Sequence, residues 1–89
     1  MNTSSPWEIV LAGPAKKALE RVPSPDRERI EATLREMAAN PFQGDLKLLK
    51  GQHKIFRRRV SVWRIFFFRV ANEKRIVVSS VERRTSTTY

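Results

Sequence analysis

Four arginines lie among large apolar side chains at residues 56–68. Alternate residues of a β-strand point to opposite faces, so Arg57 and Arg59 are expected to share one face while Phe56 and Val60 anchor the other. Arginine stays charged at physiological pH, and its planar guanidinium matches the geometry of a phosphate group. This stretch is therefore a candidate surface for the backbone of RNA or DNA.

The basic residues are concentrated in the C-terminal half of the chain. The chain has 18 Lys and Arg against 9 Asp and Glu, a net charge of +9 at pH 7, and 12 of the basic but only 2 of the acidic residues lie at residues 47–84. This segregation builds a one-sided positive field that attracts a polyanion or an acidic protein. The alternative interpretation is a solvated sheet face without a ligand.

The composition excludes several kinds of site. The absence of cysteine excludes disulfides and thiolate chemistry, and a single histidine, His53, argues against a metal site. No cofactor is therefore expected. No signal peptide and no apolar stretch of about 20 residues is present, so we expect a soluble cytoplasmic protein without a membrane partner. No glycine-rich phosphate loop accompanies the arginines, and catalysis would depend on arginine and tyrosine.

The elements that must position the arginines follow from the hydrophobic pattern. The chain, residues 1–89, is long enough for one domain with one modest core, and residues 1–6 are expected to be disordered. The pattern predicts a strand near residues 7–11, helices at residues 14–22 and from Asp26 to Asn40-Pro41, and strands at residues 54–60, 62–70 and 75–83. Residues 41–51 are expected to be a connector.

The predicted fold class is α+β, with an N-terminal helical hairpin packed on a small antiparallel sheet. The run from Ile65 to Phe68 is apolar on both faces of its predicted strand. This favours a central strand covered on both sides, and a base-stacking platform is the alternative. Arg58 faces away from Arg57 and Arg59 and is expected to meet solvent or a partner.

RNA offers chemistry that suits these residue types. The ribose 2′-hydroxyl is a nucleophile already tethered beside the phosphodiester, so a protein has to align it, assist proton transfer and stabilise charge on the phosphate oxygens. Arg57, Arg59, Arg64 and Arg83 are candidates for the last role. Tyr89, the one tyrosine, is a candidate for proton transfer, and a packing residue or a frayed end is its alternative interpretation.

Four short motifs recur together in a known family. They are Leu48-Leu49-Lys50-Gly51, Phe56-Arg57-Arg58-Arg59-Val60, Trp63-Arg64-Ile65, and Val81-Glu82-Arg83-Arg84 followed by Tyr89. With the two predicted helices before them and Pro41 after the second, they resemble the RelE/ParE superfamily of small bacterial and archaeal toxins. The resemblance covers nearly the whole chain.

The resemblance implies a toxin of a type II toxin-antitoxin system and, on the RelE side, a metal-independent mRNA interferase that cuts mRNA on the ribosome and inhibits translation. Expected partners are mRNA on the ribosome and an acidic antitoxin from an adjacent gene, which forms a hetero-oligomer with the toxin. By position, the implied catalytic residues are Arg57, Arg59, Arg64, Arg83 and Tyr89. The implied RNA-binding residues are Lys47, Lys50, Lys54 and Arg84.

The general base departs from the family pattern. Ile55 stands where some ribonuclease members carry a lysine, so the role is vacant or passes to Lys54, Tyr89 or Glu82. Glu82 is alternatively an ion-pair partner of Arg84. Two other functions remain open from the sequence: a ParE-like toxin that inhibits DNA gyrase, and a basic nucleic-acid-binding module without catalysis.

Overall fold

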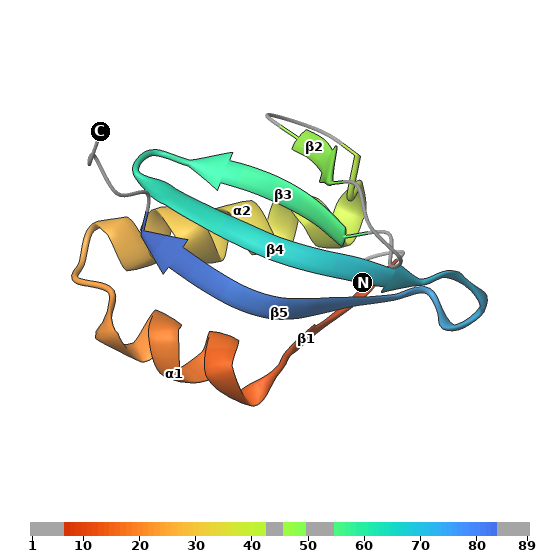
Figure 1. Cartoon of the computed structure of the whole chain (residues 1–89), viewed down its shortest axis with the longest axis horizontal. Coiled ribbons are helices and arrows are strands. Elements are labelled where there is room, and N and C mark those ends of the chain that lie inside the picture. The colour runs from red at the N-terminus through yellow and green to blue at the C-terminus, as the bar shows by residue number, and fades with distance from the viewer. Residues whose placement is uncertain (1–6, 43–45, 50–54, 84–89) are drawn as a thin grey trace, which may run out of the picture.

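The computed structural model describes residues 7–42, 46–49 and 55–83 of the chain. Its central feature is a five-stranded sheet with the strand order β1-β5-β4-β3-β2 (Figure 1). The strands are β1 (Glu8–Leu11), β2 (Leu46–Leu49), β3 (Ile55–Val60), β4 (Trp63–Val70) and β5 (Arg75–Arg83). The helices are α1 (Gly13–Arg21) and α2 (Asp26–Ala39), and a short 3-10 turn, η1 (Ala71–Glu73), joins β4 to β5. The α+β class is as predicted.

Two parts of the predicted sheet are corrected. The sheet is mixed rather than antiparallel, because β1 pairs in parallel with β5, from Glu8 opposite Arg75 to Leu11 opposite Val78. Part of the expected connector is a strand, β2, which pairs antiparallel with β3. Neither feature has a local signal, since a parallel partner lies far along the chain and a four-residue leucine-rich segment has no clear period.

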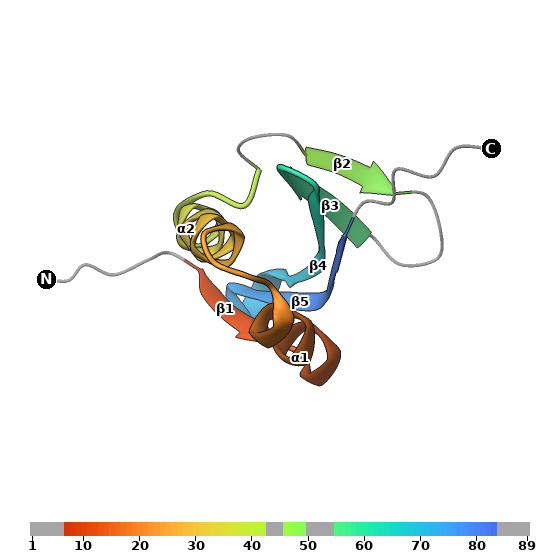
Figure 2. The same cartoon turned by 90° about the vertical axis from the view of Figure 1, so that its left-hand side faces the viewer.

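The core lies between α2 and one face of the sheet, which curves around this helix (Figure 2). Phe67, Ile65 and Ile76 from the sheet are fully buried, as are Ile30 and Met37 from α2. The shorter helix α1 runs beside β5 (Figure 1), where it contributes Ala15 and Leu19 to the same core. The face of the sheet that carries Phe67 is therefore the buried one.

A two-residue turn joins β3 to β4 and sets their register. Ser61 adopts the left-handed region, with φ of 56°, as the first residue of one class of tight hairpin turn does. The ladder closes directly beside it with Val60 opposite Trp63, and the next pair is Arg59 opposite Arg64. The described residues contain no helix long and apolar enough to cross a membrane. The expected disorder of residues 1–6 lies outside the described residues.

Candidate nucleic-acid interface

Three of the predicted arginines gather on the face of the sheet opposite α2. Along β3, Phe56 and Arg58 are buried while Arg57 and Arg59 are half-buried, so the second pair faces away from the core. Arg59 lies opposite Arg64 on β4. Directly opposed residues of antiparallel strands share a face, with Cβ atoms about 4.5–5.5 Å apart. Arg57 and Arg59 therefore share one face, as predicted, and the pairing of β3 with β4 brings Arg64 beside them.

This surface is built from rows that run across three strands. The first row is Arg59, Arg64 and Glu82, and the second is Arg57, Phe66 and Ser80. We call these six residues the arginine face. The Ser80 hydroxyl donates a hydrogen bond to Glu82 Oε2 at 3.3 Å, which connects the two rows on β5. The face therefore combines three cations, one aromatic ring and one carboxylate.

The arginine face holds two like charges directly opposite each other. Like charges directly opposite each other in a sheet are destabilising, and Arg59 and Arg64 form such a pair. Glu82, on the other side of Arg64, offsets part of this repulsion. The buried Nε atoms of Arg57 and Arg64 have no hydrogen-bond partner in the part of the chain that the structure describes. An anion on this face would relieve the repulsion and accept hydrogen bonds from the guanidinium groups.

Arg58 does not belong to this surface. Its side chain is 9% exposed on the face that α2 covers, and its Nη2 donates a hydrogen bond to Glu36 Oε1 at 3.0 Å. The expectation that Arg58 meets solvent or a partner is wrong. The strand alternation correctly predicted that Arg58 faces away from Arg57 and Arg59. The face to which it points is covered by α2 rather than exposed to solvent.

Arg83 lies apart from the row of Arg59 and Arg64. It pairs with Trp63, and the neighbouring Glu82 pairs with Arg64. The Trp63 indole binds Asp26 at the start of α2, so Arg83, which is exposed, ends β5 on the α2 side of the sheet.

A bulge explains the position of Arg83. The β4–β5 register shifts between Phe66, which pairs with Ser80, and Phe67, which pairs with Val78. Ser79 is the extra residue, and one extra residue exchanges the two faces of the strand beyond it. Without the bulge, Glu82 would point toward the core and Arg83 toward the arginines. Two adjacent serines are the one local sign of this change.

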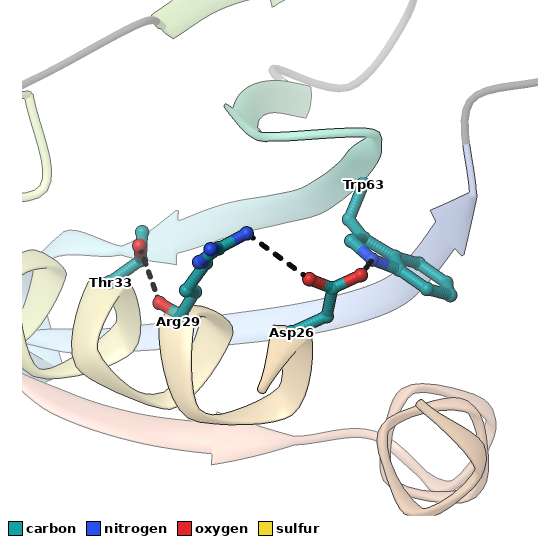
Figure 3. A network of polar contacts seen from close by, with 4 residues as sticks. All are labelled: Asp26, Arg29, Thr33 and Trp63. Carbon is teal, nitrogen blue, oxygen red and sulfur yellow. Dashed lines mark hydrogen bonds and ion pairs between the residues drawn. The ribbon is translucent and has the colours of Figure 1, made fainter. Parts of the chain in front are cut away.

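A polar network fixes the start of β4, which carries Arg64. Trp63 Nε1 donates a hydrogen bond to Asp26 Oδ2 at 2.9 Å, and Arg29 Nη1 lies 3.3 Å from Asp26 Oδ1 (Figure 3). The Thr33 hydroxyl donates to the Arg29 carbonyl oxygen at 2.9 Å, one turn further along α2. Because Arg64 directly follows Trp63, the first turn of α2 holds the strand that presents this arginine.

A second cluster of arginine and aromatic rings lies on the α2 side of the sheet. The Arg69 guanidinium carbon is 4.6 Å from the Phe42 ring centroid and 5.6 Å from that of Phe56. Phe56 stacks on Phe67 with centroids 5.4 Å apart. This arginine is therefore engaged in packing rather than in the arginine face.

Several predicted site residues are not placed. Tyr89, Lys50, Lys54 and Arg84 lie outside the described residues. Lys47 is in β2, and its backbone pairs with Arg57. No cluster of three or more metal-ligating side chains occurs within residues 7–42, 46–49 and 55–83.

The sequence matches no protein-family model and has no significant match among curated proteins. Its fold does match solved structures. The isolated E. coli RelE toxin aligns with a TM-score of 0.79 at 19% identity, over 91% of this chain and 87% of that chain. A chain of the archaeal RelE-RelB complex from Pyrococcus horikoshii OT3 gives 0.78 at 17% identity, over 91% and 98%. A chain of the RelB-RelE antitoxin-toxin complex from Methanococcus jannaschii gives 0.69 at 29% identity, over 84% and 89%.

These alignments span nearly all of this chain and of its counterparts. The chain thus has the fold of the RelE structures, as the resemblance of its sequence motifs predicted. The arginine face occupies three neighbouring strands of that fold.

Proposed function

We propose that this protein is the toxin of a type II toxin-antitoxin system and that it cleaves mRNA on the ribosome. The observation that carries the proposal is the opposed pair Arg59 and Arg64 beside Arg57, on a sheet face that also presents Glu82. Such a pair opposes folding, whereas it suits a phosphodiester whose oxygens gain negative charge during the reaction. The RelE-like fold supports the same function.

The proposed reaction is an internal transesterification. The ribose 2′-oxygen attacks the adjacent phosphorus, the bond from phosphorus to the 5′-oxygen breaks, and the products are a 2′,3′-cyclic phosphate and a 5′-hydroxyl. The 2′-hydroxyl loses its proton and the leaving 5′-oxygen gains one, so no external reactant is consumed. In this mechanism Arg59 and Arg64 bind the non-bridging phosphate oxygens, and Arg57 orients the neighbouring part of the backbone.

Glu82 is our candidate for the proton acceptor. It is exposed and lies opposite Arg64 on the same face, within the row that would hold the phosphate. A carboxylate in this place supplies the general base that Ile55 does not. Tyr89 and Lys54 remain proposals from the sequence for proton transfer. We assign Arg83 no contact with the scissile phosphate, because it ends β5 on the α2 side of the sheet and Glu82 takes the place opposite Arg64.

The proposed partner is a small acidic antitoxin encoded by an adjacent gene, and the two proteins would form a hetero-oligomer. Several of the similar structures are described as complexes of RelE with RelB. A one-sided basic surface is suited to such a partner, since an acidic segment masks its charge. Cytoplasmic localisation, where ribosomes and mRNA are found, is part of the same proposal.

Cleavage on ribosomes programmed with a defined mRNA tests this function. Wild-type protein should produce a 2′,3′-cyclic phosphate end on the upstream fragment. Arg64→Gln and Glu82→Gln should lower the single-turnover rate by at least about 100-fold, a typical effect of removing one charge-stabilising group or one general base. Arg35→Gln, which changes an exposed arginine of α2, should cleave like wild type.

The absence of ribosome-dependent cleavage by the wild-type protein would refute the proposal. Inhibition of DNA gyrase in a supercoiling assay, without RNA cleavage, would establish the ParE-like alternative. RNA binding without cleavage would establish the other alternative, a basic nucleic-acid-binding module without catalysis. Wild-type rates in both the Arg64 and Glu82 variants would show that the reaction takes place elsewhere on the molecule.

A further inference from the structure

The structure divides the aromatic run of β4 between the two faces of the sheet. Ile65 and Phe67 are fully buried in the core, whereas Phe66 and Phe68 are half-buried and point to the face opposite α2. The expectation of a strand covered on both sides therefore holds for one face only, as far as the described residues go. Two phenylalanines share a surface with three arginines, and core packing under α2 does not account for them.

Phe66 lies at the centre of the arginine face. It is directly opposite Arg57 across the β3–β4 ladder, and it follows Arg64 by two residues on the same strand. Positions two residues apart on a strand are separated by about 7 Å. A ribose joins the phosphate and the base of a nucleotide, so a nucleotide with its phosphate at the Arg59–Arg64 row reaches Phe66 with its base.

The backbone of Phe66 is held in place by the bulge in β5. Its carbonyl oxygen accepts a hydrogen bond from the Ser79 hydroxyl at 3.2 Å, and Ser79 is the bulged residue. The cation–π contacts among the described residues are formed by Arg69 with Phe42 and Phe56, on the other face of the sheet. The backbone of Phe66 is therefore anchored to β5, and the cation–π contacts among the described residues do not involve the Phe66 ring.

We infer that Phe66 is a stacking surface for one nucleobase of the RNA whose phosphate lies at Arg59 and Arg64. The inference rests on the proposed function and deepens it, since it assigns the base-contacting side of the arginine face. Stacking of a base on an aromatic ring tolerates any base and adds affinity that phosphate contacts do not provide. Phe68 belongs to the next row, with Val77 and Val10, which is two rows from Arg59 and Arg64, so it is too far from the phosphate at that pair to stack on the same nucleotide.

The test compares Phe66→Leu with Phe66→Tyr and with Phe68→Leu. Leucine keeps the apolar volume and removes the ring, tyrosine keeps the ring, and Phe68→Leu makes the same change one row away. The measurement is the toxin concentration that gives half the maximal single-turnover cleavage rate on programmed ribosomes. Each variant is assayed on normal mRNA and on mRNAs with one abasic nucleotide at each position of the A-site codon in turn. Circular dichroism verifies that each variant is folded.

Phe66→Leu should raise the half-maximal concentration at least about fivefold on normal mRNA, as expected for the loss of one base stack. It should have no such effect on the one abasic mRNA that lacks the stacked base. Phe66→Tyr should behave like wild type, and Phe68→Leu should change the concentration less than twofold. If Phe66→Leu does not fold, the test uses wild-type protein and Phe66→Tyr on the abasic mRNAs. One abasic position should then raise the half-maximal concentration of both proteins at least about fivefold.

Two failures are distinguishable. If wild-type protein cleaves and Arg64→Gln does not, but Phe66→Leu matches Phe68→Leu on every mRNA, the stacking surface is wrong and the proposed function stands. An equal effect of Phe66→Leu on all abasic mRNAs overturns the inference in the same way, since it identifies a structural effect. If wild-type protein does not cleave programmed mRNA at all, the proposed function fails and the inference fails with it.

Discussion

The arginines of β3 have two different roles although they are neighbours in the sequence. Arg57 and Arg59 are half-buried on the arginine face, whereas Arg58 is buried and bonded to Glu36 of α2. An ion pair with one buried partner stabilises the protein mainly because its loss leaves a charge without compensation. Arg58 therefore serves the attachment of α2 to the sheet, and Arg57 and Arg59 lie on the opposite face.

Removal of the Glu36 carboxylate should destabilise the fold and leave activity intact. We expect Glu36→Gln to lower the free energy of unfolding by about 1–2 kcal/mol, less than the roughly 3–5 kcal/mol of a fully buried pair, because the Glu36 side chain is 56% exposed. Urea denaturation measures this change. Glu31→Gln, on an exposed position of the same helix, is the control and should alter stability by less than about 0.5 kcal/mol.

Equal stability of the Glu36 and Glu31 variants would show that the ion pair with Arg58 contributes little. A loss of ribosome-dependent cleavage in Glu36→Gln, at a temperature where the variant is folded, would contradict the structural role of Arg58.

At the scale of elements, two local devices decide what the sheet presents. The bulge at Ser79 exchanges the faces of the last part of β5, so that Glu82 rather than Arg83 lies opposite Arg64. The contact between Trp63 and Asp26 holds the first residue of β4 to the first turn of α2. The bulge lies opposite Phe66 and Phe67, and the hydrogen bond is made by Trp63, so both devices act on β4 close to Arg64. Both depend on contacts between different elements of the chain.

The contact between Trp63 and Asp26 can be tested without loss of the ring. Trp63→Phe removes the indole N–H donor, and a hydrogen bond to a charged group contributes about 1.5–3 kcal/mol. We expect the free energy of unfolding to fall by an amount in that range, with a lower cleavage rate because Arg64 is less firmly held. Arg29→Gln removes the ion pair to the same carboxylate. Because the Arg29 side chain is 60% exposed, this change should lower the free energy of unfolding by less than about 1 kcal/mol.

Urea denaturation and single-turnover cleavage, carried out on both variants, give the comparison. An unchanged stability of Trp63→Phe would mean that the hydrogen bond contributes nothing net. A stability loss in Arg29→Gln as large as that in Trp63→Phe would show that the ion pair, not the indole, holds the network together.

At the scale of the whole molecule, the charge of the chain is divided between two functions. The net charge is +9, but some of the basic side chains are paired within the fold, such as Arg75 with Glu8 and Glu73. The arginine face concentrates three positive charges on one side of the sheet, away from α2. On the proposed function, a polyanion would therefore be attracted by the overall field and bound by the three arginines of this face.

The dependence of RNA affinity on salt should report how many phosphates the arginine face neutralises. If two phosphates are neutralised, one by Arg59 and Arg64 together and a neighbouring one by Arg57, the logarithm of the association constant should fall with the logarithm of salt concentration with a slope of about −1.4, from about −0.7 per phosphate of a single strand. Arg57→Gln should reduce the magnitude of this slope by about 0.7. Fluorescence anisotropy of a short single-stranded RNA measures it, and an unaltered slope in Arg57→Gln would exclude Arg57 as a phosphate ligand.

Much of this architecture was predictable from the sequence. The strand period placed Arg57 and Arg59 on one face, the proline and polar boundaries placed both helices, and the motifs identified the RelE-like fold. These predictions depend on local pattern, because the direction of a side chain within one regular element repeats with a fixed period.

The tertiary structure decided the features that depend on pairing between distant segments. Only the folded sheet places Arg64 opposite Arg59, sets β1 parallel to β5, and directs Glu82 rather than Arg83 to the arginine face. It also buries Arg58 under α2. Register and bulges are determined by the fit of whole strands against one another and against the helices, and a single extra residue exchanges the two faces. The residue types thus determined which chemistry is available, and the pairing of strands determined which residues meet to perform it.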